Sequence, residues 1–310
     1  MTKESLIAEI KKLKKDKNAV ILAHYYQNEE IQSIADYTGD SLGLSQQAAK
    51  TNASIIVFCG VHFMAETAKI INPNIKVVLP DLDAGCSLEA SCPPIEFKTF
   101  LDKHTDYKVI TYINCSAEIK TMSDIVCTSS NAIKVINSFP KNQKIIFAPD
   151  KNLGKYLNEQ TGRKMILWDG ACIVHEAFSI EKLLSLHKKY PKARIIAHPE
   201  SESHILEVAS FVGSTTQLID YVTTNSDLEF IVATEAGVLY KMRELNPNTR
   251  LIPAPIYDNN SCSCSECSFM KVNTLEKLRN CLRDELPEII IDSNILEKAA
   301  EPIFKMLKIK

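Results

Sequence analysis

The sequence predicts an α/β protein that is built from three similar units. Short apolar runs rich in β-branched residues alternate with helical stretches along the chain, which is typical of parallel strands covered by helices on both faces. The same order of elements occurs three times with closely matched spacing, and each copy leads to a loop that contains a cysteine. These observations indicate three α/β/α units, each with a parallel sheet as its middle layer.

The composition is that of a folded protein and excludes several classes. Hydrophobic residues make up 45% of the 310 residues and charged residues 24%, which is too apolar for a disordered chain. The formal net charge of -2 argues against a nucleic-acid binder, because such a protein needs a basic face. No apolar stretch approaches the ~20 residues of a membrane span. We therefore expect neither nucleic acid nor membrane as a partner.

The first element is an amphipathic helix within residues 1–18. Lysines lie on one face, and the opposite face is apolar and carries Leu6, Ile7, Ile10 and Leu13. Charged residues occupy the place where a secretory signal peptide needs its apolar region. We therefore expect no such signal and a cytoplasmic protein.

Three units and a C-terminal segment follow this helix. We expect the units at residues 19–105, 106–190 and 191–272, and a helical extension at residues 273–310. Within each unit the order is an apolar strand, a helix led by Ser or Thr, a second strand, a helix, and a third apolar run before the cysteine loop.

The three copies match closely in register. The first strands end at equivalent residues that are 88 and 86 residues apart: His24, Tyr112 and His198. Seventeen residues later each copy has a hydroxyl side chain: Ser41, Ser129 and Thr215. The loop cysteines follow the strand ends by 62, 60 and 69 residues: Cys86, Cys172 and Cys267. Ligands of open α/β sheets bind at the carboxyl ends of strands, so three cysteines can meet if the units pack around a pseudo-threefold axis.

Three converging cysteines indicate a metal centre with one open coordination position. Four protein ligands close a structural site, whereas three leave a position for substrate or water. A [4Fe–4S] cluster would act as a Lewis acid through its free iron, and a zinc ion with a catalytic water is the alternative. Thiolate ligands without a histidine favour the cluster. Cys262, Cys264 and Cys267 could instead form half of a zinc knuckle, although no second compact Cys/His pair completes it.

Most of the other cysteines and histidines fit structural positions. Four cysteines that follow apolar runs or lie on a helical pattern are expected in the core: Cys59, Cys115, Cys127 and Cys281. Four histidines lie in helical or surface contexts: His62, His104, His187 and His204. His175, three residues after Cys172, is left unassigned.

Polar residues at strand ends and helix starts fit an anionic small molecule. Helix starts offer hydroxyls, free backbone N–H groups and the positive end of the helix dipole, which suit carboxylate or phosphate. The alternative is that four of these residues only cap their helices: Ser41, Ser129, Ser214 and Thr215. Acid, base and hydrogen-bonding groups are added by His24, Tyr26, Tyr112, Asn114, His198 and Glu200. His198 and Glu200 are two residues apart, so both side chains point to one face.

Motifs along the whole chain together resemble the quinolinate synthase family. They are LAHYYQ (22–27), TGDSLGLS (38–45), DAGCSLEASCP (83–93), TYINCSAEIK (111–120), VCTSSNA (126–132), the Cys172 loop, AHPE (197–200), GSTTQLIDY (213–221) and CSFMKVNTLEKL (267–278). The resemblance implies three α/β/α domains around a pseudo-threefold axis and an oxygen-sensitive [4Fe–4S] cluster. By motif, the cluster ligands would be Cys86, Cys172 and Cys267. Several bacterial members have C-x-x-C-x-x-C where this chain has C-x-C-x-x-C, so a disulfide between Cys262 and Cys264 is not expected.

The resemblance also implies a cytosolic enzyme of NAD biosynthesis. Such an enzyme would condense iminoaspartate with dihydroxyacetone phosphate to quinolinate, with loss of phosphate and two waters. An aspartate oxidase or dehydrogenase is expected to supply the iminoaspartate. The site residues matched by motif are His24, Tyr26, Ser41, Tyr112, Asn114, Ser129, His198, Glu200, Ser214 and Thr215.

These residues receive hypothetical roles. Glu200 is expected to remove a carbon-bound proton with assistance from His198, while Tyr26 and Tyr112 relay protons. Carboxylates would be held by Asn114, Ser129 and Thr215, with the phosphate nearer His24 and Ser41.

Two other classes of protein remain open. A cluster-dependent hydro-lyase acting on a hydroxy acid would share the three cysteines but would not need a triose-phosphate pocket. A zinc-bound scaffold or metal-sensing module would need no catalytic groups. Activity with both substrates separates the first alternative, and metal analysis after anaerobic purification separates the second.

Overall fold

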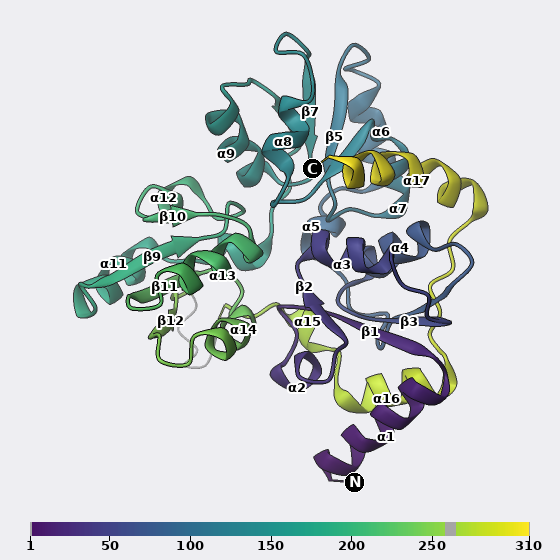
Figure 1. Cartoon of the computed structure of the whole chain (residues 1–310). Coiled ribbons are helices and arrows are strands. Elements are labelled where there is room, and N and C mark those ends of the chain that lie inside the picture. Colours follow the sequence, from purple (N-terminus) through teal and green to yellow (C-terminus); the bar gives the residue numbers. More distant parts are fainter. Residues whose placement is uncertain (1, 258–264, 310) are drawn as a thin grey trace.

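The structure is a computed structural model that describes residues 2–257 and 265–309. These residues form three four-stranded parallel sheets with flanking helices (Figure 1). All three sheets have the same order, in which the first strand of the repeat lies between the second and third, and the fourth lies beyond the third. The predicted fold class, three similar α/β/α units, is therefore confirmed.

The strands are short and mostly buried. The first sheet, in the order β2-β1-β3-β4, contains β1 (Ala19–His24), β2 (Tyr37–Gly39), β3 (Ile55–Cys59) and β4 (Lys76–Val78). The second, in the order β6-β5-β7-β8, contains β5 (Lys108–Tyr112), β6 (Ile125–Cys127), β7 (Ile145–Ala148) and β8 (Ile166–Leu167). The third, in the order β10-β9-β11-β12, contains β9 (Ala193–Ala197), β10 (Phe211–Val212), β11 (Glu229–Ala233) and β12 (Leu251–Pro253).

Two details of the strands differ from the sequence prediction. Each sheet has four strands rather than the three that we expected. The missed strands are β2, β6 and β10, and their two or three residues are too few to show a hydrophobic pattern. The last pairs between the first and second strands are His24 with Gly39, Tyr112 with Cys127, and Ala197 with Val212. His198 therefore directly follows the end of β9, while the pairing of the first and third strands (Ala23 with Cys59, Thr111 with Ala148, Ala197 with Ala233) keeps it equivalent to His24 and Tyr112.

In the described residues, five helices accompany each sheet. The first repeat has α2 (Glu29–Gln32), α3 (Ser41–Ala48), α4 (His62–Ile71), α5 (Ser87–Ala90) and α6 (Pro94–Leu101). The second has α7 (Ala117–Thr121), α8 (Ala132–Asn137), α9 (Lys151–Thr161), α10 (Ile173–Glu176) and α11 (Ile180–Lys189). The third has α12 (Ser203–Leu206), α13 (Thr215–Thr224), α14 (Val238–Leu245), α15 (Ser268–Lys271) and α16 (Leu275–Asp284). Helix α1 (Lys3–Asp16) precedes the repeats, and α17 (Ser293–Lys308) follows them.

Alternation along β1 explains how a sheet is covered on both faces. Val20 and Leu22 belong to the core shared with α3 and α4, whereas Ile21 belongs to the core shared with α1 and α16. Leu6 and Ile10 of α1 are buried in this second core, which confirms the predicted amphipathic helix. The alternate apolar side chains of β1 therefore pack against two layers of helices, one on each face of the sheet.

The last helix of each repeat covers the sheet of the next repeat. Phe97 of α6 lies in the core of the second sheet, Leu183 of α11 in that of the third, and Leu278 of α16 in that of the first. The third repeat thus closes on the first, which gives the molecule its threefold ring. The expected unit boundaries at residues 105, 190 and 272 stay predictions, but α16 has the same place in the ring as α6 and α11.

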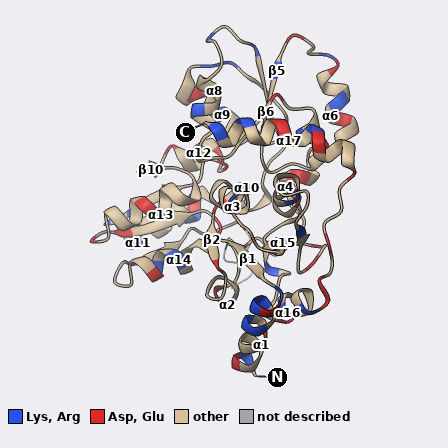
Figure 2. Ribbon diagram, turned by 45° about the vertical axis from the view of Figure 1, so that its right-hand side comes forward, with Lys and Arg blue, Asp and Glu red and all other residues tan. Residues whose placement is uncertain are grey.

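Helix α17 connects the first two repeats. It packs against α4, α7 and β6, where Ala299, Ile303 and Met306 are buried, and Figure 1 shows it beside α7 and above α4. Figure 2 shows basic beside acidic residues on the outer helices α6 and α17. In the part of the chain that the structure describes, no helix has the length and apolar character needed to cross a membrane.

The four cysteines predicted in the core are buried: Cys59, Cys115, Cys127 and Cys281.

Candidate active site

Each repeat presents one cysteine at the start of a four-residue helix. Cys86 is the N-cap of α5, Cys172 of α10 and Cys267 of α15. Burial raises the pKa of each thiol, and the backbone N–H groups of the following turn offset this only in part. In Figure 1, α5 and α15 lie near the middle of the molecule, where the repeats converge.

The cysteine turns (residues 84–86, 170–172 and 265–267) are held by the same backbone hydrogen bond in all three repeats. The donor lies three residues after the end of the third strand, and the acceptor lies two residues before the cysteine. The bonds join His62 N to Ala84 O (2.7 Å), Lys151 N to Gly170 O (2.8 Å) and Ala236 N to Ser265 O (2.9 Å). The three repeats therefore share even this individual backbone hydrogen bond.

A cavity lies where the repeats meet, and its wall contains twelve of the thirteen site residues predicted from the sequence. They are His24, Tyr26, Ser41, Cys86, Tyr112, Asn114, Ser129, Cys172, His198, Glu200, Thr215 and Cys267. Ser214, the thirteenth, is buried next to Thr215 as the N-cap of α13. The ring thus brings side chains from all three repeats to one cavity.

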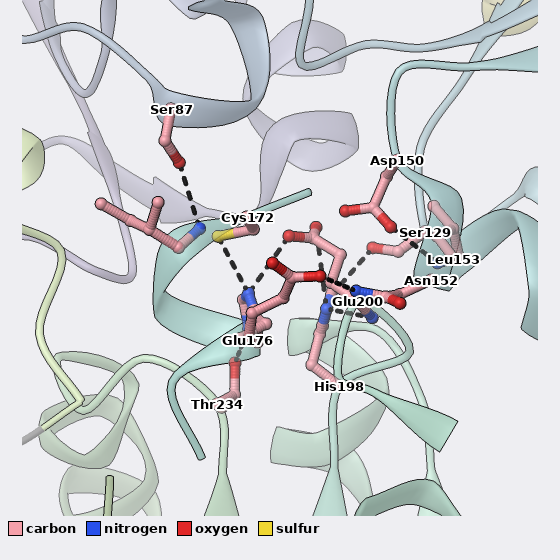
Figure 3. A network of polar contacts seen from close by, with 12 residues as sticks. Ser87, Ser129, Asp150, Asn152, Leu153, Cys172, Glu176, His198, Glu200 and Thr234 are labelled. Carbon is pink, nitrogen blue, oxygen red and sulfur yellow. Dashed lines mark hydrogen bonds and ion pairs between the residues drawn. The ribbon is translucent and has the colours of Figure 1, made fainter. Parts of the chain in front are cut away.

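Glu200 lies within a buried polar network (Figure 3). Tyr112 Oη donates to Glu200 Oε1 at 2.5 Å. His175 Nδ1 lies 3.1 Å from Glu200 Oε2, and His198 Nδ1 lies 3.7 Å from Oε1. Burial acts to raise the pKa of Glu200, but His175 and the hydrogen bond from Tyr112 outweigh it and hold the pKa below its usual range. Glu200 is therefore ionised and can accept a proton.

A chain of hydrogen bonds leads from His175 to Tyr26. His175 Nε2 lies 3.0 Å from Thr234 Oγ1, and this hydroxyl lies 3.0 Å from Tyr26 Oη. Tyr26 Oη also lies 2.9 Å from Thr215 Oγ1. Since His175 contacts Glu200, the chain gives protons a continuous path between Tyr26 and that carboxylate.

Two histidines of the wall are neutral and oriented in the same way. Tyr26 N donates to His24 Nδ1 at 3.2 Å, and Glu200 N donates to His198 Nδ1 at 3.4 Å. Burial lowers the pKa of His24 to about 4 and that of His198 to about 3. Because Nδ1 accepts in both rings, each ring carries its proton on Nε2, and His198 Nε2 donates to Ser129 Oγ at 3.3 Å. Both rings are thus neutral donors, of which His198 is bonded to Ser129 and His24 can donate to an anion.

Comparisons with known proteins assign the family. The family model described as quinolinate synthetase A protein matches residues 8–308. The chain belongs to this family. A protein named quinolinate synthase from Microcystis aeruginosa is 57% identical over 305 residues, which cover 98% of this chain and 95% of the relative. A protein of the same name from Synechocystis sp. is 58% identical over 302 residues, which cover 97% of this chain and 94% of the relative. Another from Thermosynechococcus vestitus is 56% identical over 303 residues, which cover 98% of this chain and 95% of the relative. The resemblance seen in the motifs is confirmed, and the chain is an enzyme of this family.

Ser41 and Ser129, which we predicted to bind anions, are not helix caps. Asp40 is the N-cap of α3 and accepts the N–H of Gly43 at 2.8 Å, which leaves Ser41 in the first helical position. Asn131 occupies the N-cap position of α8, two residues after Ser129. The capping alternative is therefore wrong for Ser41 and Ser129. It is correct for Ser214, whose side chain and that of Gln217 form a capping box.

Asp40 also joins the three repeats. Its Oδ2 accepts from Ser130 Oγ at 2.7 Å and from Thr216 Oγ1 at 2.8 Å, and Ser130 Oγ lies 2.9 Å from Ser214 Oγ. These contacts connect α3 of the first repeat to the residues before α8 and to the start of α13. The Asp40 junction therefore sets how the hydroxyl-bearing helix starts lie relative to one another.

Three polar atoms of the wall have no hydrogen-bond partner among residues 2–257 and 265–309. Asn114 Oδ1 is buried without a partner, and neither Ser41 Oγ nor His24 Nε2 is bonded to another residue of these ranges. Buried polar groups are normally hydrogen-bonded, so Asn114 Oδ1 points to a ligand, and the hydroxyl of Ser41 and Nε2 of His24 are available to bond to it as well.

The three cysteine thiols are not gathered closely enough for one zinc ion to bind all three. Burial raises the pKa of each thiol, and a metal would displace the proton on binding. Three sulfurs on one zinc ion would lie about 3.8 Å apart for a Zn–S bond of about 2.3 Å. Among the described residues, Cys86, Cys172 and Cys267 do not form a group of ligand atoms within 4.8 Å of one another. Cys172 forms such a group with His175 and Glu200 instead.

Cys262 and Cys264, the other members of the predicted half knuckle, lie outside the described residues.

The wall also contains four polar residues that the sequence analysis did not select: Asp40, Thr128, His175 and Glu235. His175 follows Cys172 in the first turn of α10, and its Nδ1 lies 3.3 Å from the sulfur. Its place three residues after a candidate ligand was a usable signal. Glu235 stands directly before the donor residue of its cysteine turn, as Asp150 does in the second repeat. Closer alignment of the repeats would have pointed to this position.

Proposed function

We propose that the chain condenses iminoaspartate with dihydroxyacetone phosphate to quinolinate, with loss of phosphate and two waters, in NAD biosynthesis. The observation that carries this proposal is the convergence of one cysteine from each repeat on a cavity that Glu200 and its partners also line. Membership of the family and relatives named quinolinate synthase at 56–58% identity support the product.

The proposed cofactor is a [4Fe–4S] cluster held by Cys86, Cys172 and Cys267. When bound, such a cluster supplies a Lewis-acidic iron at its open position. The three thiols are in no disulfide, they come from equivalent helix starts, and they do not all lie within 4.8 Å of one another, as three ligands of one zinc ion would. These observations favour the cluster over the zinc alternative.

The proposed base is Glu200. Its ionised carboxylate can take a carbon-bound proton from the substrate, while Tyr112 and His175 hold it in one orientation. The hydrogen-bonded chain through Thr234 allows Tyr26 to give or receive a proton as Glu200 changes its protonation state. His198 stays neutral and supports Glu200 through the backbone N–H bond to its Nδ1.

The anionic groups of the substrates need donors, and the wall supplies them. Iminoaspartate carries two carboxylates, and the triose carries one phosphate. The proposed donors are the side chains of His24, Ser41, Asn114, Ser129 and Thr215. Ser214 would act indirectly, because it caps α13 and so orients Thr215.

The test is an anaerobic assay of the purified protein with both substrates together and with each alone. We expect quinolinate only when both are present, together with iron and acid-labile sulfide in equal amounts. A colourless protein that contains zinc would exclude the cluster and favour a scaffold or sensor. Dehydration of a hydroxy acid without the triose phosphate would favour the hydro-lyase alternative.

We also propose that the enzyme works in the cytoplasm and is supplied by an aspartate oxidase or dehydrogenase. Iminoaspartate is an imine that hydrolyses in water, so a nearby source would limit its loss. A reducing compartment would also keep the cysteine ligands free.

A further inference from the structure

The third cysteine turn is attached to its sheet by a longer stretch of chain than the other two. Cys86 lies 8 residues after the end of β4 (86 − 78), and Cys172 lies 5 residues after the end of β8 (172 − 167). Cys267 lies 14 residues after the end of β12 (267 − 253). Contacts from outside this stretch hold the Cys267 turn in place.

Glu235, which follows β11, makes those contacts with its carboxylate. Oε1 accepts the backbone N–H of Cys267 at 3.0 Å, and Oε2 accepts the N–H of Gly237 at 2.6 Å. Ser265 adds a bond from its Oγ to Thr234 O at 3.1 Å. The side chain of Glu235 is 1% exposed, so these hydrogen bonds are shielded from water.

The surroundings of Glu235 are fitted to a carboxylate. Lys271, in the helix that Cys267 starts, places Nζ 3.4 Å from Glu235 Oε1 and donates to Tyr26 O at 2.8 Å. A Cβ atom on Gly237 would lie 2.7 Å from Glu235 Oε2 and 2.8 Å from Tyr26 O, so glycine leaves the room that this approach needs. The lysine also offsets the repulsion between the carboxylate and a thiolate at Cys267.

The equivalent positions in the other repeats do not reach their cysteines. Asp150 precedes the donor Lys151 as Glu235 precedes Ala236, but its Oδ1 accepts the N–H of Leu153 and caps α9. The first repeat has Val61 there, which has no polar side-chain atom. The third repeat has the longest stretch between its last strand and its cysteine. Among the described residues, it is also the repeat in which the side chain at this position, Glu235, bonds to the N–H of the cysteine.

We propose that Glu235 is a positioning residue that holds Cys267 in the place where a metal centre on the three cysteines needs it. This inference rests on the proposed function, because it assumes that Cys267 is a ligand. Glu235 acts through the backbone of the turn and through Lys271. It reduces the conformational freedom that the third ligand would otherwise lose when the metal centre binds.

The test compares Glu235→Gln with Asp150→Asn after anaerobic reconstitution. A glutamine amide turns a donor toward one of the two N–H groups and loses the charge that pairs with Lys271. We expect iron loss to a chelator about 10- to 100-fold faster in E235Q than in wild type. We also expect a changed electron paramagnetic resonance spectrum of the reduced cluster. Asp150 pairs with Gly170 only through its backbone, and its side chain bonds to Leu153 and not to the N–H of Cys172, so D150N should retain iron as wild type does.

A second measurement on the metal-free proteins separates positioning from general destabilisation. Alkylation by iodoacetamide, followed at each cysteine by mass spectrometry, should become faster at Cys267 than at Cys86 in E235Q. Equal acceleration at both sites would overturn the inference. If E235Q does not fold, Lys271→Gln serves in its place, with the same expected preference for Cys267.

The outcomes distinguish the inference from the function on which it rests. If wild type holds no iron–sulfur cluster, the proposed cofactor fails and the inference fails with it. If wild type holds the cluster and E235Q retains iron with the same rate and spectrum, only the role of Glu235 is overturned.

Discussion

Two parts of the cavity wall differ in how their polar atoms are satisfied. Glu200 has two close side-chain partners, Tyr112 Oη at 2.5 Å and His175 Nδ1 at 3.1 Å. Asn114 Oδ1, Ser41 Oγ and His24 Nε2 have no hydrogen-bond partner in the part of the chain that the structure describes. The protein itself holds Glu200 in one geometry, which is the first part of the wall. The three atoms of the second part have hydrogen bonds left to make with a bound molecule.

The difference separates chemistry from binding. A buried carboxylate with its partners in place stays oriented before substrate arrives, which is what a base needs. A buried polar atom without a partner costs about 1–3 kcal/mol, and a ligand that supplies the missing bond recovers this free energy. Substitutions in the first part should therefore lower kcat, and substitutions in the second part should raise KM.

The largest effect is expected for Glu200→Gln. Glutamine keeps the size of the side chain but cannot accept the proton, so kcat should fall about 10²- to 10⁴-fold with little change in KM. The measurement is steady-state turnover of the cluster-loaded variant under anaerobic conditions. Glu202→Gln is the matched control, because Glu202 is two residues away and its side chain is 38% exposed. Equal kcat values for the two variants would remove Glu200 as the base.

A smaller effect, on binding, is expected for Asn114→Ala. Loss of a hydrogen bond to a charged substrate group should raise KM about tenfold or more, with a smaller change in kcat. The thermal midpoint should not fall, because Asn114 Oδ1 has no protein partner to lose. Substrate titrations and thermal melts of the same preparations check both statements. A lower midpoint with an unaltered KM would contradict the division of the wall into two parts.

The smallest effect is expected for Asp40→Ala, which acts on the junction between the repeats. The variant loses the cap of α3 and the two hydroxyl contacts to the other repeats, so the free energy of unfolding should fall by about 1–2 kcal/mol. Asp40→Asn should lose less, since an amide oxygen can still cap the helix. Urea unfolding measures the difference, with Asp102→Ala as a surface control. No loss of stability in D40A would show that the junction does not hold the repeats together.

Much of the fold was predictable because its signals are local. The apolar runs of β1, β5 and β9 and the apolar face of α1 each lie within a short window of sequence, where hydrophobic periodicity can be seen. The second strands, β2, β6 and β10, were missed because two or three residues carry no period. The closure of the ring by α16 was also missed, since α16 and β1 are joined by packing and not by neighbouring sequence.

The candidate site shows the same division. The spacing of the three copies predicted which cysteines would meet, and twelve of the thirteen chosen residues do line one cavity. Whether Ser41 caps α3 could not be read from the sequence, because Asp40 stands beside it and is an equally good cap. Glu235 was missed because its partner, the backbone N–H of Cys267, is 32 residues away.

The sequence by itself determined the strands, most of the helices and the three cysteines that end equivalent turns. These depend on the residue types within one element and on a spacing that repeats. The tertiary structure decided which side chains are partnered, which are left for a ligand, and how the third repeat closes on the first. Those outcomes depend on contacts between segments that are far apart in the chain, where packing and hydrogen bonding choose among several locally acceptable arrangements.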